Sequence, residues 1–371
     1  YAYFVNGLLV LMTGTVLTYL MQDYGLDYNL GGFLVSVQAI GNLLSGLFSG
    51  AIIYLLGRRK SLLLVAAAFT IGFGGIVFVS SPILLFILMF LTGIGWGLNN
   101  NLLNILVTEA TDGNSSYTNI LHMSFAVGAF ISPLVVSTLV GLNISWKVPV
   151  LLIAIASGIL VIVFIKMPLK EKIKKEKGKE KLSFAFLKDP KYFIYTMILF
   201  CYVGSETCLN SWLITYLVER GIMEITSAQK ILSLLWLVII FGRIVIAYIS
   251  KYIRKDLLLS VQCISMFVAI GIFLINQNPA IAVLAIIAMG LSMAGIYPTT
   301  VANASYIVAG EGLGSGVMFA GGGLGAAVVP YLAGAIAENN GILGGMLSTL
   351  VIVLIMIILA IANRRLIKSS N

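Results

Sequence analysis

The chain has 371 residues, of which 60% are hydrophobic and only 10% are charged. Soluble globular proteins carry about a quarter of charged residues, so this composition excludes an ordinary soluble domain and indicates a polytopic membrane protein. The formal net charge of +9 lies mostly in short segments between apolar stretches, where basic residues set the orientation in a bilayer, so we expect no nucleic-acid partner.

Twelve stretches are long and apolar enough to cross a bilayer, which takes about 20 residues at 1.5 Å each. They cover residues 3–20, 30–56, 61–80, 82–108, 117–140, 146–165, 192–217, 226–250, 256–276, 280–308, 313–336 and 342–362. We therefore predict an all-α membrane protein with twelve transmembrane helices. Residues 1–166 would form an N-terminal six-helix bundle, 167–191 a basic cytoplasmic linker, and 192–371 a C-terminal six-helix bundle with a short cytoplasmic tail.

Basic residues predict the orientation. The linker and its edges hold Lys166, Lys170, Lys172, Lys174, Lys175, Lys177, Lys179, Lys181, Lys188 and Lys191. The remaining basic residues, except Lys147, Arg220, Lys230 and Arg243, fall on the same side of the span count. The positive-inside rule then places the linker and both termini in the cytoplasm of a protein of the cell membrane. Because the chain opens at Tyr1 rather than Met, we expect a short piece to precede it.

The second half of the chain repeats the first with an offset of 197 residues. TYL at 18–20 recurs at 215–217, GAFISP at 128–133 recurs as GAAVVP at 325–330, and Gly93 recurs as Gly290. Since each half would contain an even number of spans, the two repeats would have the same orientation in the membrane.

When charges near the span ends are set aside, three ionisable side chains remain within the predicted spans, where such groups usually face a cavity or a partner: His122, Glu206 and Arg243. Glu206 shares one helical face with Tyr202 and Asn210 at spacings of four residues, so we predict a proton-handling carboxylate beside substrate contacts, or else a structural carboxylate bound to a neighbouring helix. His122 is a candidate for proton relay, or a structural donor, because imidazole titrates near neutral pH. Arg243 near the end of its span is expected to be structural or gating.

A second polar face lies in the span 82–108. Trp96, Asn100 and Asn104 recur every four residues, which combines an aromatic plate with amides that both donate and accept hydrogen bonds. This chemistry suits a sugar, although amides that hold helices together would give the same pattern. Weaker candidates for substrate binding are Gln38, Asn42, Trp212, Tyr297 and Asn303, of which Tyr297 is the repeat counterpart of Asn100.

Together with these features, the loop GAIIYLLGRRKSLL at 50–63 resembles the G-x-x-x-D-R-x-G-R-[KR] loop of the major facilitator superfamily. Gly57, Arg58 and Arg59 match it and would act in gating, whereas Tyr54 stands where the family has an acidic residue. GIGWGLNNNLLN (93–104), LHMSFAVGAFISP (121–133) and CYVGSETCLNSWLITYL (201–217) are similar to segments of the fucose/glucose proton symporter type of sugar permease. In those relatives an acidic residue often stands near Asn100.

The resemblance implies a secondary transporter that works by alternating access, with proton-coupled uptake of a sugar or similar polar solute as its activity. Efflux or flipping of an amphipathic compound or lipid, and a transporter-like solute sensor, remain alternatives. No phosphate-binding G-x-x-x-x-G-K-[ST] or metalloprotease H-E-x-x-H motif occurs, and the three cysteines lie within spans, so we expect no enzyme, metal or cofactor. The expected partners are the small-molecule solute, the proton and membrane lipid, with the protein acting as a monomer.

Overall fold

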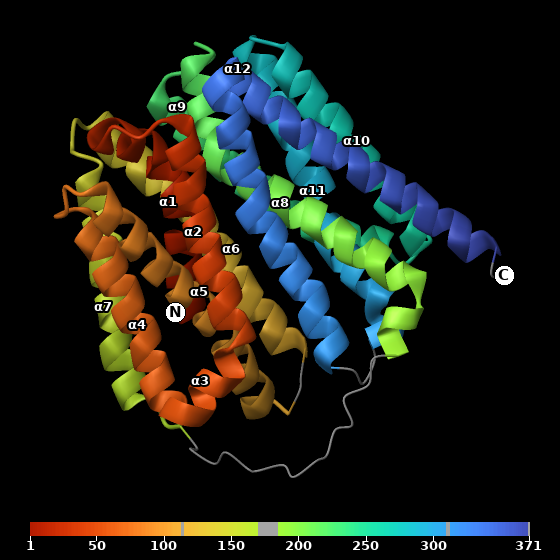
Figure 1. The fold of residues 1–371 in the computed structure, drawn as a ribbon, viewed down its shortest axis with the longest axis horizontal. Coiled ribbons are helices and arrows are strands. Elements are labelled where there is room, and N and C mark those ends of the chain that lie inside the picture. The colour runs from red at the N-terminus through yellow and green to blue at the C-terminus, as the bar shows by residue number, and fades with distance from the viewer. Residues whose placement is uncertain (113–114, 170–184, 309–311, 370–371) are drawn as a thin grey trace. The chain divides into compact units, whose positions relative to one another are not determined.

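The computed structural model describes residues 1–112, 115–169, 185–308 and 312–369 and contains only helices among them (Figure 1). The α-helices are α1 (Ala2–Tyr24), α2 (Tyr28–Leu47), α3 (Ser49–Leu56), α4 (Arg58–Ile76), α5 (Pro82–Ala110), α6 (Ser115–Gly141), α7 (Lys147–Lys166), α8 (Pro190–Glu219), α9 (Ile225–Ile249), α10 (Lys255–Ile275), α11 (Pro279–Val308) and α12 (Gly312–Ser369), with a short 3₁₀ helix at Ala185–Lys188. Much of the predicted linker, residues 170–184, lies outside the described residues.

The longest helix, α12, contains two of the predicted spans. Gly341 has φ 67° and ψ 171°, a left-handed conformation that glycine adopts without a steric penalty, and it interrupts the helix. Figure 1 shows the two parts of α12 as rods that meet at a bend. Eleven helices among the described residues are long and apolar enough to cross a membrane, so the division of α12 accounts for the twelve predicted spans.

The predicted span at 30–56 is divided at Phe48 into α2 and α3. As one helix it would be about 40 Å long, which exceeds the hydrocarbon thickness of about 30 Å. The break shortens the membrane-crossing part, and α3 presents exposed Tyr54 and Leu55. Gly57, with φ 78°, then separates α3 from α4.

Contacts divide the chain into two compact units, each built of helices. Unit 1 comprises Tyr1–Leu26 and Leu34–Glu180, and unit 2 comprises Asp27–Phe33 and Lys181–Asn371. In unit 1, α1 packs against α6 and α4 packs against α5 and α7. In unit 2, α8 packs against α12 and α11 packs against α9 and α10.

Glycines allow close helix contacts, and one of these contacts occurs in both units. A methyl group added at Gly93 on α5 would overlap the carbonyl oxygen of Gln38 on α2. A methyl group added at Gly290 on α11 would lie 3.1 Å from the carbonyl oxygen of Leu235 on α9. Both residues of the second pair stand 197 positions after those of the first. The offset found in the sequence thus recurs as the same kind of helix contact.

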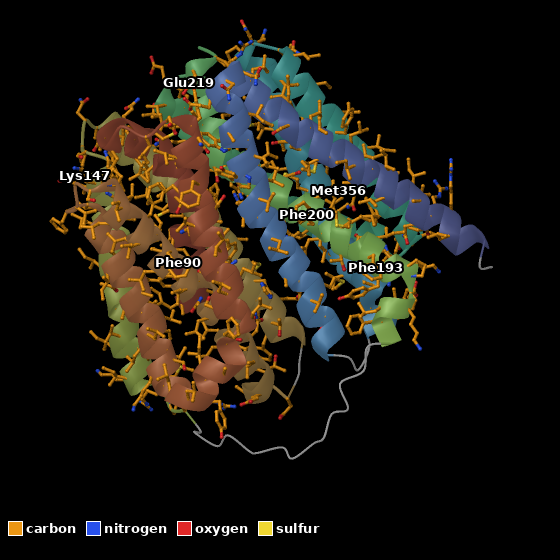
Figure 2. The ribbon with its side chains drawn as sticks, in the orientation of Figure 1. Phe90, Lys147, Phe193, Phe200, Glu219 and Met356 are labelled. Atoms are coloured by element: carbon orange, nitrogen blue, oxygen red, sulfur yellow. The ribbon has the colours of Figure 1, made fainter. Side chains whose placement is uncertain are left out.

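Replacing Gly325 by Ala should destabilise the protein by about 1–3 kcal/mol, because overpacking of a close contact costs this much. The added methyl group would overlap the carbonyl oxygen of Phe200, a residue that Figure 2 shows on α8. Thermal unfolding of the purified protein in detergent measures the effect. The control is Gly271→Ala on α10, where a methyl group meets no atom within 4 Å; equal melting temperatures for both variants would contradict the packing argument.

Candidate functional site

A polar cluster in unit 1 joins α1 to α5. The Tyr3 hydroxyl donates to the backbone oxygen of Asn100 at 3.0 Å, and the Asn104 amide donates to the Tyr3 hydroxyl and, at 2.7 Å, to the same backbone oxygen. Asn6 Nδ2 donates to Asn100 Oδ1 at 2.9 Å. Asn6 is fully buried, and its own Oδ1 has no partner among the described residues. The predicted Asn100 and Asn104 are therefore held in place by two residues of α1.

His122 contacts this cluster, and Trp96 lies near it on α5. Trp96 lies one helical turn before Asn100, is partly buried, and has an indole Nε1 without a hydrogen-bond partner among the residues that the structure describes. His122 on α6 is exposed, and its ring meets the Tyr3 ring edge-on with centroids 5.5 Å apart. Tyr3 thus contacts residues of both α5 and α6.

Other amides of unit 1 connect helices. Asn101 Nδ2 donates to the Gly46 carbonyl at 2.8 Å and to Ser49 Oγ at 3.1 Å. Gln38, predicted as a substrate contact, is buried and donates to Thr92 Oγ1 at 3.0 Å. Asn42 is partly buried, and its backbone lies against α5 at Gly97.

Asn99 is the buried amide of this region that has no visible bond. Its side chain is fully buried, and neither amide atom has a partner within the described part of the chain. Asn101, by contrast, joins α5 to α2 and α3 through its bonds to Gly46 and Ser49.

Unit 2 contains the carboxylate cluster. Tyr202 is buried on α8, and its hydroxyl lies 2.9 Å from Glu206 Oε1 and 3.0 Å from the backbone oxygen of Met293 on α11. One hydroxyl proton therefore faces two acceptors. The Tyr202 hydroxyl therefore connects the middle of α8 to α11, with the Glu206 carboxylate beside it on α8.

Arg243 and Tyr297 complete this cluster. Arg243 on α9 interacts electrostatically with Glu206, Tyr202 and Tyr297. The Tyr297 ring lies 6.4 Å from that of Tyr202 and stacks on Phe319 of α12 at 6.4 Å with an interplanar angle of 14°. Tyr297 is 39% exposed, so an aromatic surface lies open next to a carboxylate and a cation.

Of the other predicted contacts of unit 2, Asn210 and Trp212 bond to neighbouring helices. Asn210 Oδ1 accepts a hydrogen bond from Trp236 Nε1 on α9 at 3.1 Å. Trp212 is buried, and its Nε1 donates to the Pro330 carbonyl of α12 at 3.1 Å. Asn303 on α11 is partly buried and its Nδ2 lacks a partner among the described residues.

The basic loop after α3 ties together three helix ends within unit 1. Arg58 forms a two-pronged ion pair with Glu109 at the end of α5, with N–O distances of 2.6 and 2.7 Å. Arg59 donates to carbonyls at the end of α7, including that of Met167 at 3.0 Å, where the free carbonyls of a helix attract a cation. Glu109 therefore supplies the acidic partner that is absent at Tyr54, which is 62% exposed.

The structure brings Asn100, Asn104 and His122 together around Tyr3 in unit 1, and Glu206 and Tyr297 together around Tyr202 in unit 2. Gln38, Asn210 and Trp212 instead bond to other residues. The structure also adds partners that the sequence analysis missed. Tyr3 and Asn6 on α1, Met293 through its backbone, and Phe319 belong to the two clusters. The residue types of Tyr3 and Asn6 gave one usable signal, since both are polar groups three residues apart in an apolar span. The roles of the predicted residues in transport stay predictions.

The sequence model of the Major Facilitator Superfamily matches residues 1–309. The chain belongs to the major facilitator superfamily. The family and the similar proteins described below are membrane transporters rather than enzymes. This chain is therefore a multi-pass membrane transporter, and its substrate is a small molecule.

Among curated proteins, this transporter is 22% identical over 320 residues to the glucose/mannose transporter GlcP of Bacillus subtilis (strain 168), covering 83% of this chain and 79% of GlcP. Its fold matches the nucleoside transporter NupG with a TM-score of 0.76 at 16% identity, over 99% of this chain and 98% of that one. It matches the D-xylose-proton symporter with a TM-score of 0.72 at 16% identity, over 96% and 95% of the two chains. The predicted all-α facilitator fold is confirmed.

The contact between Tyr202 and Glu206 should be measurable as a coupling energy in a double-mutant cycle. We expect about 1 kcal/mol of coupling between Tyr202→Phe and Glu206→Ala, the typical net contribution of one hydrogen bond. Tyr216→Phe, combined with the same Glu206→Ala, is the matched control. The buried Tyr216 hydroxyl donates to the Leu274 carbonyl, and Tyr216 lies about 15 Å beyond Glu206 along α8. Thermal unfolding in detergent measures both cycles, and equal coupling in the two would rule out the specific contact.

Proposed function

We propose that this transporter takes up a sugar, or a similar polyhydroxylated solute, together with protons by alternating access. In this proposal Glu206 carries the proton, and Asn100, Asn104 and Trp96 contact the solute. Tyr202, Asn210 and Tyr297 contribute from unit 2, and His122 is a second candidate for proton handling.

The observation that carries the proposal is the position of one hydroxyl proton between two acceptors. If Glu206 is ionised, the Tyr202 hydroxyl can satisfy either the carboxylate or the Met293 carbonyl fully, but not both. If Glu206 is protonated, its O–H can donate to the Tyr202 oxygen while the Tyr202 O–H donates to Met293. The protonated carboxyl group therefore satisfies the whole chain of bonds.

Loss of the proton would have to be compensated by charge. Ionised carboxylates in an apolar helix bundle are costly unless they have a partner. Arg243 supplies a positive charge that interacts electrostatically with Glu206. Both protonation states of Glu206 thus have support from neighbours, which is what a group that loads and releases a proton requires.

The sugar assignment is supported by the unit 1 cluster and by the named relatives. Amides and tyrosine hydroxyls suit a solute with many hydroxyl groups, and aromatic faces such as Trp96 suit the apolar face of a sugar ring. A glucose/mannose transporter and a D-xylose-proton symporter are among the similar proteins. The nucleoside transporter NupG makes nucleosides a necessary comparison in any substrate panel.

We also propose that the transporter lies in the cell membrane as a monomer with both termini in the cytoplasm. The distribution of basic residues favours cytoplasmic termini in the cell membrane. Two six-helix bundles, 1–166 and 192–371, would move around a site near the middle of the membrane, in a monomer surrounded by lipid. Gly57, Arg58, Arg59 and Arg243 would then act in gating, with Arg243 serving the carboxylate as well.

Purified protein in vesicles should accumulate a labelled sugar only when a pH gradient is imposed. The panel contains glucose, mannose, xylose, a nucleoside and an amphipathic dye. In Glu206→Gln, we expect solute exchange to continue and accumulation to be lost, because Gln can donate to Tyr202 as the protonated acid does but cannot release a proton.

The matched control is Glu224→Gln, at the start of α9, where the carboxylate makes no side-chain capping bond; it should accumulate solute like the parent protein. Accumulation by Glu206→Gln equal to that of the parent would remove Glu206 from the proton role. Transport of the dye alone, unaffected by Asn100→Ala, would favour the efflux alternative.

A further inference from the structure

The first two turns of α2 belong to a different unit from the rest of the helix. Asp27–Phe33 groups with the helices of unit 2, whereas α2 groups with unit 1 from Leu34 onward. A continuous helix is thereby shared between the two units.

Two carboxylates of unit 2 bind the first residue of α2. Glu338 Oε2 on α12 accepts a hydrogen bond from the Tyr28 backbone N–H at 3.0 Å, and the Tyr28 hydroxyl donates to Glu219 at the end of α8. The start of a helix has free N–H groups and a partial positive charge, which an anion satisfies. Asp27 caps the helix locally by accepting from the Leu30 N–H at 2.7 Å. Glu338 therefore adds a second cap, supplied from 310 residues away.

Next to these bonds, glycines allow the backbones of α2 and α12 to approach each other closely. A methyl group at Gly32 would lie 2.8 Å from the Pro330 carbonyl oxygen and 3.3 Å from the Gly334 Cα. A methyl group at Gly334 would overlap the Tyr28 carbonyl oxygen. The small side of α12 at Gly334 therefore lets the backbone at the start of α2 approach closely.

The bonds that hold the helix end are exposed, although the contact itself is close. Glu219 and Glu338 are both exposed side chains, and hydrogen bonds in contact with water contribute little net free energy each. Such a contact can be held and released by small changes in free energy, as a two-state element requires.

We propose that Tyr28, Glu219 and Glu338 form a clasp that holds the start of α2 on α8 and α12 and opens during the transport cycle. The cycle is that of the proposed function, but the clasp itself is defined by contacts within unit 2. Tyr28 contributes two groups to the clasp: its backbone N–H binds Glu338, and its side-chain hydroxyl binds Glu219.

A cross-linking experiment tests the clasp without any solute. Phe33 and Tyr331 have ring centroids 6.2 Å apart, so Phe33→Cys with Tyr331→Cys should react with a short bifunctional thiol reagent. The three native cysteines are buried, and each single substitution serves as a control for their reaction. Adding Tyr28→Phe or Glu338→Ala should slow cross-linking by about threefold to tenfold each, the effect of losing one modest hydrogen bond.

Glu224→Gln is the matched control, because it neutralises a carboxylate that caps no helix through its side chain, and it should leave the cross-linking rate unchanged. Hydrogen exchange of the α2 peptide provides an independent readout, and it should become faster in Tyr28→Phe and Glu338→Ala. Equal cross-linking rates and equal exchange in all variants, or no cross-linking in the parent pair, would overturn the clasp.

A functional arm separates the clasp from the solute assignment. Cross-linking the Phe33→Cys and Tyr331→Cys pair should stop exchange of the panel solutes that the uncross-linked protein carries, with recovery after reduction of a cleavable reagent. Full exchange by the cross-linked protein would show that the clasp need not open. If none of the sugars is carried, the proposed substrate fails while the cross-linking and hydrogen-exchange results still decide the clasp.

Discussion

Glu206 places a carboxyl group among apolar helices, and the surrounding structure has to accommodate it. Glu206 can stay in such surroundings only if its neighbours satisfy it, because an unpaired charge there is costly. The Tyr202 hydroxyl and the Met293 carbonyl provide a chain of hydrogen bonds for the protonated acid, and Arg243 provides a compensating charge for the ionised one. A site that accommodates both states is suited to carrying a proton.

The second requirement is a scaffold that presents these polar groups on rigid helices. Close contacts at Gly93 and Gly290 bring helix backbones together in each unit, and no hydrophobic driving force holds helices together within lipid, so such packing is essential. The start of α2 uses the same device at Gly32 and Gly334, with hydrogen bonds that are easier to release. In this proposal the close glycine contacts keep each unit rigid, and the exposed bonds of the clasp allow the start of α2 to move.

Local patterns predict the helices and the candidate polar faces, since hydropathy, the 197-residue offset and spacings of four residues are all visible in the sequence. Contacts between residues that are far apart in the chain produce no comparable pattern in the sequence. Asn6 contacts Asn100 across 94 residues, and Tyr202 reaches Met293 across 91. Met293 acts through its backbone, which its side-chain type does not reveal. Glu109 replaces an acidic residue expected at another position, because geometry rather than register decides which carboxylate meets Arg58.

Proton movement, measured separately from solute movement, shows whether Glu206 carries the proton. A pH-sensitive dye outside vesicles that contain the purified protein should report proton uptake when a transported sugar is added without any imposed gradient. We expect alkalinisation with the parent protein, and none with Glu206→Gln even though labelled sugar still exchanges. Solute-driven alkalinisation of equal size in both proteins would contradict the assignment of the proton to Glu206.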